Sequence, residues 1–237
     1  MEERPGFSKI WTVIGIAVAF AVLFVIILFV RQTYFYYRDI KQGKGVNPGQ
    51  ISRTKKLHPS VVAEIAQLKQ LVSGTADVPF SGPASATHEV VEFVDFDCPN
   101  CLAMESQVRD LASQRPDVKI TYRDYPILDL HPDAMDAAKA ARCVWRQGDA
   151  RTYWRFRETM LANQGKLNAD NLRDFAGMLN LDLGRYDACV RDPSVEAQVN
   201  QSISVGENAG VEGTPTFFID GIKVEGALPL ELLDQQF

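Results

Sequence analysis

Two of the four cysteines stand close together in the motif Cys98-Pro99-Asn100-Cys101. The preceding residues, 89–96, are rich in Val and Phe and predict a β-strand, while apolar residues at helical spacing follow the motif. A cysteine at the start of a helix meets unpaired backbone N–H groups and the positive end of the helix dipole, and both favour its thiolate. We therefore predict that Cys98 attacks a disulfide and that Cys101, one turn deeper, resolves the mixed disulfide.

Half of a zinc site is the competing interpretation of a C-x-x-C motif, but zinc needs two further ligands at suitable spacing. Cys143 and Cys189 are isolated from each other in the sequence. The three histidines, His58, His88 and His131, form no cluster typical of a metal site, and we interpret His131 as a structural or capping residue. Since the sequence also has no nucleotide-binding loop, we expect neither a metal nor a diffusible cofactor.

A proline interrupts an otherwise β-branched and aromatic run, VEGTPTFF, at residues 211–218. Proline removes a hydrogen-bond donor from a β-ladder, so Pro215 needs an explanation such as a strand edge, a bulge or a cis turn. The dipeptide Asp220-Gly221 then predicts a hairpin turn into a strand at 222–225.

Taken together, the segments FVDFDCPNC and GVEGTPTFFIDG resemble the DsbA-like branch of the thioredoxin superfamily. The resemblance covers residues 77–237 and implies an α/β thioredoxin fold with a helical domain inserted at about 131–208. It also implies that the Thr214–Pro215 peptide is cis, faces the cysteines and holds an extended substrate segment. By the same resemblance, Cys98 matches the attacking cysteine and Cys101 the resolving one.

Glu92 matches the acidic residue that this family places six positions before its first cysteine. Strand alternation independently puts Val90, Glu92 and Val94 on one face, so Glu92 would be a carboxylate among apolar neighbours. A buried carboxyl has a raised pKa and could relay protons to or from Cys101. A solvent-facing carboxylate at the strand edge is the alternative.

Some members of this family carry cysteines at the positions of Cys143 and Cys189. The resemblance to those members implies that the two cysteines form a structural disulfide. Closing a loop of this length would stabilise the domain by about 3–4 kcal/mol. Two buried free thiols are the alternative. A structural disulfide would imply an oxidising compartment and so a domain outside the cytoplasm.

The active-site motif departs from that of the strongest oxidants of the family, which resemble Cys-Pro-His-Cys. Asn100 supplies no positive charge where those relatives have an imidazole. Asp97 adds a negative charge directly before Cys98, which should raise the pKa of its thiol. Both effects predict a milder oxidant, with a Cys98 less acidic than in those relatives. Pro99 and Asn100 also tune the redox potential.

An apolar leader precedes this domain. After a tail at 1–9, residues 10–30 carry no charge and are long enough for a helix to span the roughly 30 Å hydrocarbon core, which predicts a single uncleaved transmembrane anchor. A cleaved signal peptide is less consistent with that length. Residues 31–76 predict a linker that contains a short amphipathic helix, whose apolar positions are Val61, Ile65, Leu68 and Val72.

Charge is divided unevenly between these parts. Residues 1–60 hold nine basic and three acidic side chains, and residues 61–237 hold sixteen and twenty-seven. An acidic body argues against nucleic-acid binding. Flanking charges alone would place the body in the cytoplasm, but the bias is small, and we give more weight to the oxidising compartment that a disulfide requires.

The sequence therefore predicts a membrane-tethered thiol–disulfide oxidoreductase that acts outside the cytoplasm and forms disulfides in exported proteins. The family implies reoxidation by a quinone-linked oxidase in the membrane. One alternative is a disulfide reductase or isomerase of the same fold, kept reduced by another membrane partner. Another is a thioredoxin-like module that binds copper or a client protein.

Overall fold

The computed structural model describes residues 23–24, 27–31, 34, 59–74, 78–226 and 228–229. The chain divides into two compact units, Met1–Lys55 and Lys56–Phe237. Most of the apolar run at 10–30 lies outside the described residues, and those of it that are described are helical. Within the described ranges, no helix is both long and apolar enough to cross a membrane.

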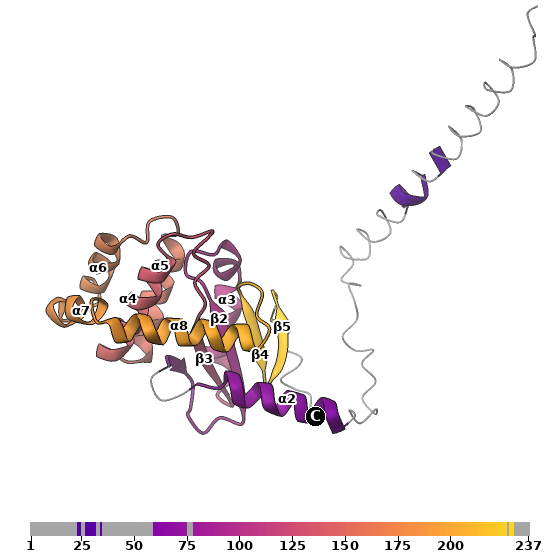
Figure 1. The fold of residues 1–237 in the computed structure, drawn as a ribbon, viewed down its shortest axis with the longest axis horizontal. Coiled ribbons are helices and arrows are strands. Elements are labelled where there is room, and N and C mark those ends of the chain that lie inside the picture. The colour runs from indigo at the N-terminus through magenta and orange to yellow at the C-terminus, as the bar shows by residue number, and fades with distance from the viewer. Residues whose placement is uncertain are drawn as a thin grey trace, which may run out of the picture. The chain divides into compact units, whose positions relative to one another are not determined.

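The second unit is built on a mixed sheet with the strand order β1-β3-β2-β4-β5 (Figure 1). Its strands are β1 (Phe80–Ser81), β2 (His88–Val94), β3 (Val118–Asp124), β4 (Thr216–Ile219) and β5 (Ile222–Glu225). β2 and β3 are parallel, and the other neighbours are antiparallel. The central place of β2 brings the end of this strand, where the cysteine motif begins, beside both β3 and β4.

Helix α3 (Pro99–Gln114) connects β2 to β3, and the helices α4–α8 lie between β3 and β4. They are α4 (Ala134–Gln147), α5 (Ala150–Ala162), α6 (Ala169–Gly177), α7 (Leu183–Val190) and α8 (Pro193–Asn208). Helices α4–α7 lie together to one side of the sheet, whereas α8 runs across it (Figure 1). The predicted insertion at about 131–208 therefore corresponds to the helices α4–α8.

The alternation of side chains along β2 divides the core between the two faces of the sheet. Val90 and Val94 belong to a cluster with α3 and the inserted helices, and Glu92 shares their face. Val91 and Phe93 belong to a second cluster, formed with residues of α2 (Pro59–Val72) and the end of α8. As a result, any charge on Glu92 lies under α3 and the insertion.

Helix α2 lies in the segment 31–76 that the sequence assigns to a linker, and in the structure it is part of the unit Lys56–Phe237. The buried guanidinium of Arg123 donates to the carbonyl oxygens of Val72 and Ser73, at 2.6 and 2.8 Å. These carbonyl groups at the end of the helix have no partner within it, so Arg123 supplies their hydrogen bonds. The reason for the difference is that Arg123 lies far away in the sequence, so no local pattern around α2 reveals it.

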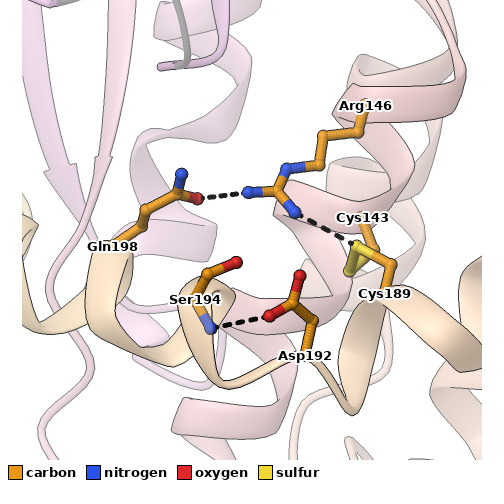
Figure 2. The surroundings of a disulfide bond; sticks show 6 residues. All are labelled: Cys143, Arg146, Cys189, Asp192, Ser194 and Gln198. Atoms are coloured by element: carbon orange, nitrogen blue, oxygen red, sulfur yellow. Dashed lines mark hydrogen bonds between the residues drawn. A yellow bond between two sulfur atoms is a disulfide. The ribbon is translucent and has the colours of Figure 1, made fainter.

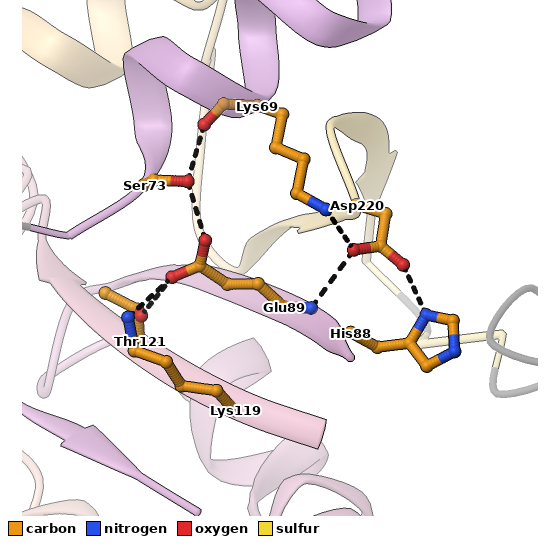
Figure 3. A network of polar contacts seen from close by, with 7 residues as sticks. All are labelled: Lys69, Ser73, His88, Glu89, Lys119, Thr121 and Asp220. Carbon is orange, nitrogen blue, oxygen red and sulfur yellow. Dashed lines mark hydrogen bonds and ion pairs between the residues drawn. The ribbon is translucent and has the colours of Figure 1, made fainter. Parts of the chain in front are cut away.

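A network of hydrogen bonds and ion pairs also attaches α2 to the end of the sheet where β2 begins and β4 ends (Figure 3). The carboxylate of Asp220 lies between the Lys69 ammonium, at 2.7 Å, and Nδ1 of His88, at 2.6 Å. The hydroxyl of Ser73 donates to Glu89 at 2.6 Å. A β-carbon at Gly221 would collide with the Ile65 carbonyl oxygen, so the predicted hairpin turn approaches α2 closely.

The substitution Asp220→Asn should loosen this attachment. Burial raises the pKa of the Asp220 carboxyl, but hydrogen bonds from Lys69, His88 and the Glu89 N–H outweigh it, so the pKa is lowered. We expect the free energy of unfolding to fall by about 1–3 kcal/mol at neutral pH, measured by denaturant titration.

This difference in the free energy of unfolding should have its full size above the ordinary Asp pKa of about 3.9. It should vanish as the pH falls through the lowered pKa of Asp220, because the wild type then also loses the charge. As a control, Asp136→Asn removes an exposed ion pair with Lys139 and should change stability little. An equal effect of both substitutions would contradict the attachment.

A disulfide joins Cys143 of α4 to Cys189 of α7, with an S–S distance of 2.05 Å (Figure 2). Beside it, the Arg146 guanidinium contacts Cys189 Sγ at 3.8 Å and donates to the Gln198 side chain on α8 at 2.8 Å. The disulfide and Arg146 therefore connect three helices of the insertion.

Replacing both Cys143 and Cys189 by Ala should lower the free energy of unfolding by about 3–4 kcal/mol, because the 46-residue separation no longer constrains the unfolded chain. Thermal and denaturant unfolding measure the change. Reductant should destabilise the wild type but not the double variant. An unfolding curve of the wild type that is insensitive to reductant would contradict a stabilising disulfide.

Candidate active site

The cysteine motif lies where β2 ends and α3 begins. Cys98 is the N-cap residue of α3, with extended backbone dihedrals, and Pro99 is in the first helical turn. This is the position where proline fits a helix best, since the first N–H groups have no partner inside the helix. Cys98 is 7% exposed and Cys101 fully buried, and the two are free thiols in this structure.

Side chains from the insertion hold the motif in place. Gln164, which follows α5, donates from Nε2 to the carbonyl oxygens of Phe96 and Cys98, at 3.1 and 2.7 Å. The carboxylate of Asp97 accepts from the Gly165 N–H at 2.6 Å. Pro99 and Asn100, the two residues between the cysteines, are exposed. Asp97 therefore contributes a structural contact besides its charge.

The proline motif meets the cysteine motif in space. The Thr214–Pro215 peptide is cis, and the Cys98 thiol donates to the Thr214 carbonyl oxygen with a distance of 3.3 Å between sulfur and oxygen. Thr214 is nearly buried, and its hydroxyl oxygen has no hydrogen-bond partner within the described part of the chain. The two segments on which the family resemblance rests thus form one site.

The two thiols differ in acidity. A hydrogen bond from the Cys101 thiol lowers the pKa of Cys98 to about 5, although desolvation opposes it, and Thr214 and the N–H groups of Cys101 and Asn100 assist. Burial raises the pKa of Cys101 well above its ordinary value, and the charges of Cys98 and Glu92 add to the effect. At neutral pH, Cys98 is therefore a thiolate and Cys101 keeps its proton.

Glu92 is completely buried, so the alternative of a solvent-facing carboxylate is wrong. Its Oε1 accepts from Nη2 of Arg157 on α5 at 2.9 Å. The same guanidinium contacts Oε2 of Glu105 on α3 at 2.8 Å. Burial raises the pKa of Glu92, with Arg157 acting against it.

Arg157 and Glu105 are absent from the sequence-based prediction of the site. Arg157 lies in the stretch TYWRFR, whose aromatic residues at helical spacing are typical of a core helix. Glu105 follows Cys101 by four residues, so helical spacing puts both on one face of α3, and this signal was available. The pairing of Arg157 and Glu105 with Glu92 could not be inferred from the sequence, because it joins residues from three distant segments.

His131 also proves to belong to the site. Its Nδ1 lies 2.8 Å from Oδ2 of Asp95, a buried carboxylate that also accepts from the N–H groups of Asp97 and Ile127. Burial lowers the pKa of His131, but the bond and charge of Asp95 and the charges of Asp97 and Cys98 outweigh it, so the pKa is raised. The interpretation of His131 as a merely structural residue is therefore incomplete.

Substitution of His131 by Gln should raise the pKa of the Cys98 thiol by up to about one unit, because an imidazolium and a thiolate stabilise each other. The pH dependence of thiolate absorbance in the ultraviolet measures this pKa. His88→Gln is a matched control, since His88 is paired with Asp220 at the opposite end of β2. An unchanged Cys98 pKa in the His131 variant would disprove the interaction.

Residues 75–236 match the family model described as thioredoxin. The chain is similar to the structure of the thiol-disulfide exchange protein alpha-DsbA2 from Wolbachia pipientis, with a TM-score of 0.65 and 25% identity, covering 76% of this chain and 96% of that one. A thioredoxin-like oxidoreductase from Silicibacter pomeroyi DSS-3 gives a TM-score of 0.62 and 27% identity, covering 70% and 92%.

Among curated proteins, the chain is similar to the Na(+)/H(+) antiporter NhaA 1 of Salinispora arenicola (strain CNS-205). The two are 34% identical over 152 residues, which are 64% of this chain and 23% of the antiporter. The chain therefore spans less than a quarter of the length of this relative. The thioredoxin model, in contrast, matches well over half of the chain and includes both halves of the site. The chain belongs to the thioredoxin family.

Proposed function

We propose that this protein is a thiol–disulfide oxidoreductase that forms disulfides in exported proteins. The observation that carries the proposal is the arrangement of two free thiols, with Cys98 at the N-cap of α3 beside the cis Thr214–Pro215 peptide and Cys101 fully buried one turn deeper. This arrangement lowers the pKa of Cys98 and raises that of Cys101. Stabilising the Cys98 thiolate stabilises the reduced enzyme, and a stabilised reduced form makes the disulfide a stronger oxidant. The similar structures from Wolbachia pipientis and Silicibacter pomeroyi support the reaction type.

In the proposed reaction, a substrate thiolate attacks Sγ of Cys98 in the oxidised enzyme. The Cys98–Cys101 bond breaks, a mixed disulfide forms, and Cys101 leaves as a thiolate that must take up a proton. A second substrate thiolate then attacks the substrate sulfur and releases Cys98 as a thiolate. The substrate loses two electrons and the enzyme gains them, so no cofactor is needed.

The cis peptide beside Cys98 and exposed apolar side chains on neighbouring elements suit an extended, partly apolar protein segment as the substrate. The cis Thr214–Pro215 peptide contacts Cys98 directly. Exposed apolar side chains occur on α3, at Leu102, and in the loop that leads to His131, at Leu128 and Leu130. An unfolded protein presents such segments, whereas a folded one buries them.

The oxidising compartment and the membrane tether are parts of the same proposal. The Cys143–Cys189 disulfide is of the kind that persists outside the cytoplasm. Residues 10–30, which are uncharged and long enough to span the hydrocarbon core, would supply the tether. A quinone-linked oxidase in the same membrane would accept the two electrons and restore the Cys98–Cys101 disulfide.

The reduction potential of the Cys98–Cys101 pair tests the direction of electron flow. Equilibration with glutathione buffers should give a value between about −120 and −200 mV, as expected for an oxidase. A value near about −270 mV would overturn the oxidase and indicate the reductase of the same fold.

The exchange mechanism itself is tested with two cysteine variants in a refolding assay on a reduced protein. Cys98→Ala should abolish disulfide formation. With oxidised glutathione in the buffer as the oxidant, Cys101→Ala should accumulate mixed disulfides at Cys98 that a non-reducing gel reveals. Equal activity of the wild type and the Cys98 variant would rule out dithiol catalysis.

A further inference from the structure

Three charged side chains meet in the interior beneath Cys101. They are Glu92 of β2, Glu105 of α3 and Arg157 of α5, and each is at least nine-tenths buried. The guanidinium lies 2.9 Å from Glu92 and 2.8 Å from Glu105. It also lies against the rings of Tyr122 and Trp154, at 5.0 and 5.4 Å from their centroids, so it cannot turn toward other acceptors without losing these contacts.

The charges in this buried cluster do not balance. Arginine keeps its positive charge in proteins, so two ionised carboxylates would leave a net charge of −1 in the core. An unpaired buried charge is expensive, and a buried group changes its protonation state instead. Among the residues that the structure describes, one oxygen of each carboxyl, Oε2 of Glu92 and Oε1 of Glu105, also has no hydrogen-bond partner. The cluster is electrically neutral when one carboxyl carries a proton.

The contacts indicate which carboxyl carries it. Oε2 of Glu105 lies 2.8 Å from both Nε and Nη2 of Arg157, whereas Glu92 is contacted through Nη2 alone. Glu105 therefore holds the stronger pairing with Arg157. Burial and the negative charge of Glu105 raise the pKa of Glu92, while Arg157 opposes them. The charge of Glu92 in turn acts on Cys101.

We propose that Glu105 is a positioning residue that, by occupying Arg157, leaves Glu92 free to hold the proton that Cys101 needs. The proposal deepens the exchange reaction proposed above and rests on it. Cys101 also lies one helical turn before Glu105 on the same face of α3, so the thiol and the cluster share one interior.

The proton transfer is balanced within these groups. When a thiolate attacks Cys98 and the Cys98–Cys101 bond breaks, the electron pair of that bond stays on Cys101. The O–H bond of Glu92 then breaks and an S–H bond forms on Cys101. The Glu92 carboxylate that remains is stabilised by Nη2 of Arg157, and the reverse transfer accompanies reoxidation.

The substitution Glu105→Gln removes the competing charge and should fix Glu92 as a carboxylate paired with Arg157. The rate at which dithiothreitol reduces the Cys98–Cys101 disulfide of the full chain, divided by the dithiothreitol thiolate concentration, measures departure of Cys101. We expect this rate to fall by about 10- to 100-fold at neutral pH and to recover as the pH is lowered, since acid restores the proton on Glu92.

Matched controls separate this effect from a general loss of structure. Glu158→Gln on α5 removes an exposed carboxylate paired with Arg109 and should leave the pH profile of the wild type unchanged. Glu105→Asp retains the charge and should keep most of the rate. Glu92→Gln should lower the rate without the recovery in acid. A wild-type pH profile in a folded Glu105→Gln variant would overturn the proposal.

Infrared spectroscopy of the oxidised wild-type chain tests the bound proton without any variant. A band of a protonated buried carboxyl should be present at neutral pH and be absent in Glu105→Gln; its absence in the wild type would also overturn the proposal. The kinetic assay uses only dithiothreitol and the infrared measurement uses no reductant, so neither depends on a protein substrate. A wild type that shows the band and reacts with dithiothreitol but oxidises no protein would refute the proposed function alone.

Discussion

The burial of a carboxylate in the middle of the central strand is the constraint on which the rest of the site depends. Glu92 faces the side of β2 that α3 and the inserted helices cover, where an ionised carboxyl without a partner would be very unfavourable. The partner, Arg157, comes from α5. The inserted helices thus do more than cover the sheet: they supply the counter-charge beneath Cys101 and, through Gln164, anchor the motif that carries Cys98.

Local signals in the sequence were sufficient for the parts of the site that depend on neighbouring residues. Cys98 stands at a strand end and a helix start, and both elements follow from side-chain pattern. Asp220-Gly221 predicts the β4–β5 turn, where both residues have positive φ. Alternation along β2 was enough to predict the face of Glu92. Each of these inferences needs only a few consecutive residues, because backbone conformation is determined over that range.

Contacts between distant segments could not be inferred in the same way. Arg123 fastens the end of α2 across the sheet, so α2 belongs to the folded unit and not to a linker. Arg157 looks like one charge in an aromatic helix until the fold brings it to Glu92 and Glu105. In both cases a buried guanidinium satisfies groups from another element, and side-chain type alone does not identify the acceptor.

The two histidine–aspartate pairs at the ends of β2 show why the same pairing has different consequences in one fold. The carboxylate of Asp220 binds both His88 of β2 and Lys69 of α2, so this pair attaches α2 to the sheet. His131 instead lies 2.8 Å from the buried carboxylate of Asp95, and the charges of Asp97 and Cys98 also raise its pKa. Once protonated, this imidazole must offset two carboxylates before its charge can stabilise a thiolate at Cys98. A histidine–aspartate pair therefore attaches a helix at one end of β2 and is coupled to the reactive cysteine at the other.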